Sequence, residues 1–521
     1  MGGGMMPKMF LPAGLLLTGL IWLASGGFVR AAGPKPDVST NLLSVDLGTK
    51  YQTMDNFGAN DAWSMQKIGA WSESARNRVA DLLFSTNRGI GLSCWRFNCG
   101  AGINHETIRD DWRTVETFEL AAGEYDWNRQ ANERWFLRAA KAHGVRQFLA
   151  TFYSPPARLT RNGLSNLGSD KTSTTNLKPG AEDEYARYIT DILIHFRDHP
   201  DARERIEFDY VLPVNEPQWD WQGGQEGNRA ANADLKKIYS ALARHLNLAG
   251  LKTKILGPES GSLPDLVSLD AGARAKWGAD YGDYLRLICG DPAMAVGFGG
   301  VISYHSYWSD QIPGQLLPDR EKLALALTHY PGWKIWQSEY CLMESGRDLG
   351  MDSALRVARI IHFDLSLVNA SAWQWWSAVA NEDFKSGLIY TDYKKSGDAE
   401  TIYESKILWI LGNYSRFIRP GMVRVEMRGS QLPEVNSLLG SAYLNPASGQ
   451  VVMVFVNQSY QSRFVRIGFA GVEKSALQAN YFTPYTTSAE NNLQVGAVVD
   501  VAHGFALPPR SVVTLVPNRE N

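Results

Sequence analysis

Short apolar runs alternate with amphipathic segments along most of the chain, and this alternation limits the possible folds more than any other feature of the sequence. The amphipathic segments have helical periodicity, and glycine follows two of them, Gly144 after Glu133–His143 and Gly250 after Leu235–Ala249. Strand-like runs separated by helices are typical of βα units, and eight such runs predict a (β/α)8 TIM barrel of the α/β class rather than an open doubly wound sheet. The runs are one that ends near Phe57 and Gly58, then Gly91–Asn98, Gln147–Ser154, Phe208–Asn215, Lys254–Ser260, Val301–Tyr307, Trp333–Tyr340 and Ala372–Ser377.

The pattern changes after about Arg419 to short β-branched and aromatic runs with two-residue alternation, as in Val451–Asn457 and Ser511–Val516. This change predicts a small all-β module. The segment Leu42–Tyr51, ahead of the barrel, also has an extended character, and we expect it to pair with that module. The predicted organisation is a linker and N-terminal strand over 33–57, the barrel over 58–416 and the all-β module over 417–521.

The first 32 residues have the pattern of a secretory signal peptide. Lys8 precedes an uncharged stretch, Met9–Val29, and the small residues Ala31 and Ala32 follow it. A membrane anchor is the alternative, because 21 uncharged residues are enough to cross a bilayer, but Pro12 and the Gly- and Ser-containing end of the stretch favour cleavage. Both interpretations predict export, either as a secreted, periplasmic or extracellular protein or with an uncleaved N-terminal anchor.

The composition argues against several classes of partner. Lys and Arg together number 52 and Asp and Glu 54, so the charge balance does not favour nucleic acid or anionic lipid. The sequence has no phosphate-cradling glycine loop, no His-Glu-x-x-His and no Gly-x-Ser-x-Gly elbow, so we expect no cofactor and no nucleotide, zinc-protease or serine-esterase chemistry. The 17 Trp, 21 Tyr and 20 Phe instead suit a protein that binds flat apolar faces such as those of sugar rings.

The four cysteines predict no metal site. Cys94, Cys99, Cys289 and Cys341 form no Cys-x-x-Cys pair and have no neighbouring His at zinc spacing. In an oxidising compartment a Cys94–Cys99 disulfide is one interpretation, and buried thiols are the other.

Two of the apolar runs lead into a carboxylate at the end of a strand, where the active sites of such barrels lie. Glu216 follows Phe208–Asn215, and Glu339 lies near the end of Trp333–Tyr340. Runs four and seven occupy opposing arcs of the ring, so the two carboxylates can face each other across the barrel mouth. Glycoside hydrolysis needs such a pair, one group protonated and one ionised, about 5–5.5 Å apart in a retaining enzyme. Either glutamate alone could instead be a salt-bridged rim residue, but the two strings together favour catalysis.

Two longer strings are the most distinctive motifs of the chain, Asn-Glu-Pro-Gln-Trp-Asp-Trp at Asn215–Trp221 and Arg-Phe-Ile-Arg-Pro-Gly at Arg416–Gly421. With Ser338-Glu339-Tyr340 they resemble glycoside hydrolase family 30, and within it most of all the endo-β-1,6-galactanase branch. The resemblance extends over about residues 40–517. Further matching strings are Met54–Gly58, Gly91–Asn98, Ser154–Pro156 and Thr160–Gly163.

The resemblance implies a retaining double displacement, with Glu216 as acid/base and Glu339 as nucleophile. Asn215 would then donate a hydrogen bond to the sugar 2-hydroxyl, a contact that strengthens in the transition state. The resemblance also implies that the all-β module is a C-terminal β-sandwich, packed on the barrel and joined by the N-terminal strand. Cys94 and Cys99 bracket the second-strand motif where aromatic or small residues are expected, so the local shape there stays open.

Other strand-end residues are candidates for substrate binding. Arg96 could orient the nucleophile or a sugar hydroxyl, or it could neutralise an aspartate at the rim. His305 and Tyr307 alternate onto one strand face, and we expect them to contact the catalytic pair unless one of them is packed in the core. One of Trp373 and Trp375 is expected to form the floor on which the sugar ring stacks.

Two groups of loop residues complete the predicted site. Trp219 and Trp221, just beyond the acid/base, are candidates for the leaving-group side, with packing of their own loop as the alternative. Asn60, Asp61 and Trp63, after the first strand, are expected to form the opposite subsite wall.

The sequence therefore predicts a retaining endo-glycoside hydrolase that acts on β-linked hexose polysaccharide, with β-1,6-galactan as the first candidate substrate. A β-1,6-glucanase or a β-xylan-directed hydrolase of the same family is the alternative. A non-catalytic carbohydrate-binding protein is the alternative from another class, but it should lack one of the two carboxylates. The expected partner is a polysaccharide or oligosaccharide, with no nucleic acid and no stable membrane partner after signal cleavage, and we expect a monomer.

Overall fold

The structure is a computed structural model that describes residues 40–171, 174–311, 314–392, 399–429, 437–471 and 480–518. The predicted signal peptide over 1–32 lies outside the described residues. Within the described ranges, no helix is both long and apolar enough to cross a membrane.

Eight strands form a closed barrel, and each predicted apolar run contains one of them. The pairing runs in parallel from β9 through β10, β11, β2, β3, β6 and β7 to β8. Two backbone hydrogen bonds close the ring between β8 and β9: Ser303 donates to Gly257 over 2.9 Å and His305 donates to Ser260 over 2.8 Å. The strands are β2 (Asn56–Asn60), β3 (Cys94–Asn98), β6 (Gln147–Thr151), β7 (Tyr210–Leu212), β8 (Lys254–Ile255), β9 (Val301–His305), β10 (Lys334–Glu339) and β11 (Ala372–Ala380).

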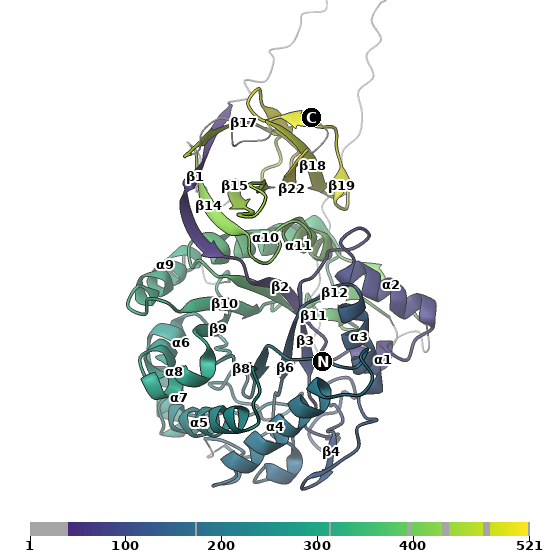
Figure 1. The fold of residues 1–521 in the computed structure, drawn as a ribbon, viewed down its shortest axis with the longest axis vertical. Helices are drawn as coiled ribbons and strands as arrows, with labels where there is room; N and C mark the ends of the chain where they lie inside the picture. The colour runs from purple at the N-terminus through teal and green to yellow at the C-terminus, as the bar shows by residue number, and fades with distance from the viewer. Residues whose placement is uncertain are drawn as a thin grey trace, which may run out of the picture. The chain divides into compact units, whose positions relative to one another are not determined.

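Helices surround these strands (Figure 1). Serine side chains cap the starts of two of them: Ser72 Oγ accepts from the Ala75 N–H over 3.4 Å, and Ser405 Oγ accepts from the Leu408 N–H over 3.2 Å. Gly144 and Gly250, expected after helices, have φ values of +87° and +61°, which glycine adopts without strain. The helices are α1 (Met65–Ile68), α2 (Glu73–Phe84), α3 (Ala131–Ala142), α4 (Glu182–Arg197), α5 (Asn232–Leu248), α6 (Pro264–Val267), α7 (Ala271–Trp277), α8 (Pro292–Phe298), α9 (Leu316–Leu327), α10 (Met351–Ser366) and α11 (Lys406–Ser415).

Short additional elements follow four of the barrel strands, β3, β6, β8 and β11. The elements are the hairpin β4 (Glu119–Ala121) and β5 (Glu124–Tyr125), the turn of 3-10 helix at Ala157–Leu159, the π-helical segment Leu285–Cys289, and the strands β12 (Gly387–Tyr390) and β13 (Tyr403–Glu404), which extend the barrel sheet beyond β11.

The barrel interior is a packed core that ends in polar side chains at the mouth. Successive strand residues point to opposite faces, so Arg96 lies on the inward face two residues after Cys94. By the same alternation, His305 shares the inward face of β9 with Val301. The apolar residues that fill the interior are Cys94, Leu149, Leu212, Leu256, Val301, Trp336 and Ala372.

The remaining strands form the predicted β-sandwich. The N-terminal strand β1 (Asn41–Thr53) pairs antiparallel with β14 and parallel with β17, so the chain ends are joined in one sheet as expected. Asn413 of α11 ties the sandwich to the barrel: its Nδ2 donates to Thr514 Oγ1 over 3.0 Å. These strands are β14 (Val423–Gly429), β15 (Leu438–Leu444), β16 (Val451–Asn457), β17 (Arg463–Ala470), β18 (Tyr481–Thr487), β19 (Gln494–Val495), β20 (Val499–Asp500), β21 (Phe505–Leu507) and β22 (Ser511–Pro517).

A buried ion pair between Arg320 and Asp364 links α9, α10 and β11 in the barrel wall. Asp364 of α10 accepts from Arg320 Nε of α9 over 2.9 Å, from Ser306 Oγ over 2.8 Å and from Trp373 Nε1 of β11 over 2.9 Å. The side chains of Asp364 and Arg320 are both fully buried. Removal of either partner would therefore leave an uncompensated charge in the core.

We expect Asp364→Ala to lower the free energy of unfolding by about 3–5 kcal/mol, because Arg320 would stay buried without its counter-ion. Urea denaturation measures this loss. Asp352→Ala is the matched control, since Asp352 lies on the same helix with an 86% exposed side chain, and it should change stability little. A loss below about 1 kcal/mol for Asp364→Ala, the range of surface pairs, would contradict the assigned role.

Candidate active site

A cavity of about 430 Å³ opens at the carboxyl ends of the barrel strands. Both predicted carboxylates and several predicted aromatic residues reach it, from strand ends and from the loops that follow different strands. Its lining residues are Arg113, Asn215, Glu216, Trp219, Asp220, Trp221, Gln225, Tyr307, Trp308, Glu339, Cys341, Met343, Trp376, Glu382, Phe384 and Ser386.

Glu216 and Glu339 face each other in this cavity. A carboxylate oxygen of each, and a ring nitrogen of His305, all lie within 4.8 Å of one another. Glu339 is the last residue of β10, whereas Glu216 stands four residues beyond β7 with a φ of +43°. The Glu216 backbone is held by a hydrogen bond from its N–H to the Glu259 carbonyl, 2.9 Å long. This spacing is the one expected of a retaining carboxylate pair.

His305 lies between the two carboxylates, as the sequence predicted. Its Nδ1 is 2.9 Å from Glu216 Oε1 and 3.6 Å from Glu339 Oε1. Tyr307 donates its hydroxyl to Glu339 Oε1 over 3.1 Å. Both contacts match the expectation that the two residues of this strand end meet the pair.

Arg96 and a third carboxylate, Glu259, lie directly beneath the pair. Arg96 Nη2 is 3.4 Å from Glu339 Oε2 and donates to Glu259 Oε2 over 3.0 Å. The Arg96 Nη1 group donates to the backbone carbonyl of Ser338. Arg96 therefore contacts the Glu339 carboxylate, as anticipated, and its second carboxylate partner is the buried Glu259 rather than an aspartate at the rim.

The electrostatics of this cluster follow from its burial. Burial alone would lower the pKa of His305, but attraction to Glu339, Glu216 and Glu259 raises it to about 10. Burial raises the pKa of Glu339 to about 7, although His305 and Arg96 oppose the rise. Carboxylates engage both ring nitrogens of His305, which favours the cationic imidazole at neutral pH.

The residues after β7 lie where the sequence placed them, at the cavity wall. Asn215 is 2% exposed, and its side-chain oxygen has no hydrogen-bond partner. Trp221 Nε1 donates to the Glu216 carbonyl over 3.1 Å. Trp219 lies against Gly261, where a Cβ atom would come within 2.1 Å of Trp219 Nε1. The two indoles thus line the cavity and also pack against the loop that carries the acid/base candidate.

Of the three residues at and just after the end of β2 that were predicted to form the opposite subsite wall, only Trp63 lines a cavity. Trp63 lines a small adjoining cavity of about 30 Å³. Asn60 and Asp61 do not line either cavity: the Asn60 amide donates to the Tyr153 hydroxyl, and Asp61 Oδ1 accepts from the Asn98 N–H over 2.8 Å. Burial raises the pKa of Asp61 well above its usual value. Asn60 and Asp61 therefore lie behind the cavity wall and support it without lining the cavity.

The prediction that Trp373 or Trp375 forms the floor on which the sugar ring stacks was wrong, because both side chains lie on the outer face of β11. Trp373 and Trp375 are fully buried on the outer face of the strand, where their indole N–H groups donate to Asp364 and to the Ser386 carbonyl. Trp376 points inward at the next position and lines both cavities. Side chains alternate between the two faces of a strand, and Ala372 points into the barrel. The same alternation places Trp376 on the inner face and Trp373 and Trp375 on the outer face.

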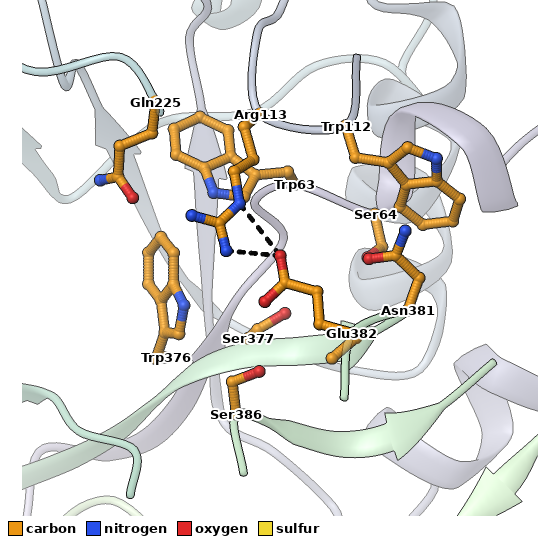
Figure 2. A pocket seen from close by; sticks show the side chains of 11 residues that line it. Trp63, Ser64, Trp112, Arg113, Gln225, Trp376, Ser377, Asn381, Glu382 and Ser386 are labelled. Atoms are coloured by element: carbon orange, nitrogen blue, oxygen red, sulfur yellow. Dashed lines mark hydrogen bonds and ion pairs between the residues drawn. The ribbon is translucent and has the colours of Figure 1, made fainter. Parts of the chain in front are cut away.

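An ion pair that the sequence analysis missed crosses the boundary between the two cavities. Arg113 donates from Nε and Nη2 to Glu382 Oε1, over 3.0 and 2.5 Å. Figure 2 shows these side chains meeting with Trp376 on one side and Ser64 and Asn381 on the other. Both residues come from loops, after β3 and β11, and no local motif marks them.

The cysteines are free thiols. Cys94 and Cys99 are both buried, so the disulfide interpretation gives way to the buried-thiol one. Cys94 belongs to the barrel interior, and Cys341 lines the active-site cavity beside Glu339.

Comparison with known proteins decides the family. The model of the O-glycosyl hydrolase family 30 matches residues 40–390. The chain belongs to glycoside hydrolase family 30. An endo-beta-1,6-galactanase of Hypocrea rufa is 24% identical over 80% of this chain and 81% of its own length. The glucuronoxylanase XynC of Bacillus subtilis (strain 168) is 28% identical over 92% of each chain.

A solved structure extends the similarity to three dimensions. The crystal structure of a conserved exported protein from Bacteroides fragilis superposes with a TM-score of 0.81 at 30% identity, covering 91% of this chain and all of that one. The (β/α)8 barrel with a β-sandwich is therefore the fold of this family 30 chain, and O-glycosyl hydrolysis is its class of reaction.

Proposed function

We propose that this family 30 hydrolase is a retaining endo-β-1,6-galactanase. One observation supports the retaining mechanism above all others: carboxylate oxygens of Glu216 and Glu339 lie within 4.8 Å of each other at the mouth of the cavity. Inverting enzymes hold their carboxyl groups roughly 6.5–9.5 Å apart to admit a water molecule.

The proposed reaction runs in two steps. Glu339 attacks the anomeric carbon while Glu216 gives its proton to the glycosidic oxygen, so the leaving sugar departs as an alcohol. Glu216 then removes a proton from water, which displaces Glu339 from the glycosyl-enzyme and restores both carboxyl groups. Asn215 binds the sugar 2-hydroxyl, and Trp219 and Trp221 contact the leaving-group side.

The charges around the cavity support a neutral substrate. Among the described residues, Arg113 is the one cationic side chain in the cavity lining, and it is already paired with Glu382. Asp220, on the same lining, is paired with Arg229 over 3.0 Å. An anionic sugar would thus find no free cation here, which favours a galactan or a glucan over a glucuronate-bearing xylan.

The remaining expectations are part of the same proposal. A chain with this activity acts on a glycan outside the cell, and the N-terminal segment is proposed as a secretory signal. We propose that the enzyme works as a monomer, because all the catalytic groups described here come from one chain.

Product analysis on β-1,6-galactan, β-1,6-glucan and glucuronoxylan tests the proposed function. We expect internal cleavage of β-1,6-galactan, with a series of oligosaccharides as early products. Proton NMR should show that the first anomer formed keeps the β configuration. An inverted product would exclude the covalent mechanism, and preferential cleavage of another glycan would exclude the galactanase assignment.

Glu339→Ala tests in the same assays whether Glu339 is the nucleophile. It should lower hydrolysis by far more than tenfold, and azide should restore turnover by replacing the missing nucleophile. Activity within about tenfold of the wild type would show that another group attacks the sugar.

Trp376→Ala should raise KM about threefold or more, because aromatic contacts contribute about 0.5–1.5 kcal/mol beyond the area they bury. Oligosaccharide kinetics measure this change. Trp376→Phe keeps a ring at the cavity wall and should recover much of the affinity. An unchanged KM in Trp376→Ala would remove Trp376 as the surface on which the sugar stacks.

Glu382→Gln should relax the discrimination against acidic glycans, because it frees the Arg113 guanidinium. The ratio of kcat/KM for a glucuronate-capped galacto-oligosaccharide to that for its uncapped form should rise about fivefold, the equivalent of ~1 kcal/mol. The double variant Arg113→Gln/Glu382→Gln should lose this gain.

Glu204→Gln is the matched control for this ratio. Glu204 is also paired with an arginine, Arg138, but it does not line the cavity, and its replacement should leave the ratio unchanged. A rise in both glutamate variants, or in neither, would refute the role of the Arg113–Glu382 pair.

A further inference from the structure

A third buried carboxylate, Glu259, connects the two cationic side chains, Arg96 and His305, that lie beside the catalytic pair. It lies in the loop after β8, is fully buried and has a φ of +58°. Its Oε2 accepts from Arg96 over 3.0 Å and contacts His305 Nε2 at 3.2 Å, while its Oε1 accepts from Ser338 Oγ over 2.7 Å. Its own carbonyl accepts from the Glu216 N–H over 2.9 Å.

Glu259 does not line the cavity, so it has no direct contact with a sugar bound there. Burial of a carboxylate is costly unless cations and hydrogen-bond donors compensate it. Burial would raise the pKa of Glu259, but Arg96 and His305 lower it to about 2. Glu259 is therefore a permanent anion held in contact with two cations.

The charges of this cluster can be counted. Arg96 and His305 are cationic, and Glu259 neutralises one of them. The one positive charge that remains is balanced when Glu216 and Glu339 together carry a single negative charge and a single proton. That is the form in which one group can attack and the other can protonate the leaving oxygen.

The other ionisable groups that face the cluster do not change this count. Burial raises the pKa of the cysteine thiols and tyrosine hydroxyls among them further above neutral, so they stay uncharged near pH 7. Burial also raises the pKa of Asp61 well above its usual value, which favours its uncharged form. These groups are Asp61, Cys94, Tyr153, Tyr239, Tyr307 and Cys341.

We propose that Glu259 is a positioning residue that holds one proton on the Glu216–Glu339 pair, because its negative charge leaves only one cationic charge for the pair to balance. This role rests on the proposed retaining mechanism and adds to it the group that sets the working protonation state. Without Glu259, two cations would face the pair, and the loss of its last proton would become easier.

The pH dependence of Glu259→Gln tests this role. Glutamine keeps the shape and an acceptor oxygen but removes the charge. We expect the alkaline limb of the kcat/KM profile to move to lower pH by about one unit or more, because without the Glu259 anion the two cations favour the fully ionised form of the carboxylate pair. Activity at pH 7 should fall about tenfold and recover at more acidic pH.

Two variants separate this effect from simple damage. Ser338→Ala removes a hydrogen bond to Glu259 without a change of charge, and its alkaline limb should stay in place. Glu226→Gln replaces another fully buried glutamate, whose pKa burial raises to about 8, so that it is largely uncharged already. Its profile should also be unchanged. An unshifted limb in Glu259→Gln, or an equal loss at all pH values, would overturn the proposal.

Histidine NMR on the wild-type protein tests the charge count without relying on the folding of a Glu259 variant. The His305 resonance, assigned by its absence in His305→Asn, should remain that of an imidazolium up to about pH 8. Titration of His305 below pH 7 would overturn the proposal. If His305 stays charged but no glycan is cleaved with retention, the proposed function fails while the charge arrangement stands.

Discussion

The contact of Arg96 and His305 with Glu259 is the interaction on which the active site depends. These three side chains are fully buried, and each would carry an unacceptable desolvation cost alone. They come from β3, β9 and the loop after β8, so the cluster can form only when the ring is closed between β8 and β9. Once formed, it positions both proposed catalytic carboxylates, Glu216 through His305 and Glu339 through Arg96. The geometry of this carboxylate pair therefore depends on barrel closure.

The sequence predicted the fold because the fold depends on short-range patterns. Each apolar run became a barrel strand, and the rule that chemistry lies at strand ends selected Glu216 and Glu339, whose carboxylates the structure brings together. The same rule could have found Glu259, which lay inside the predicted run Lys254–Ser260. That run was taken as a strand throughout, whereas β8 ends at Ile255 and leaves Glu259 free to turn beneath its neighbours.

The residues that the sequence misplaced are those whose role depends on which way a strand faces or on contacts between distant loops. Trp373, Trp375 and Trp376 lie within four residues of one another, so composition cannot separate them, and only the register against Ala372 does. Arg113 and Glu382 are far apart in the chain and meet through the fold. No periodicity predicts such a pair, since its members lie in irregular loops.

Chemistry and specificity are carried by different parts of this barrel. The proposed catalytic groups lie at or just beyond strand ends, above buried charges, whereas much of the cavity wall comes from the longer loops after β3, β7 and β11. A substitution of Arg113 or Glu382 can alter a wall without disturbing the buried charges, because these two side chains pair with each other. The loop after β7 is the exception, since Trp221 donates to the Glu216 carbonyl. This separation explains how one family can act on galactan and on xylan with the same fold. It also means that overall sequence identity is a weak guide to substrate here, and that the charge and aromatic character of the loop residues are a better one.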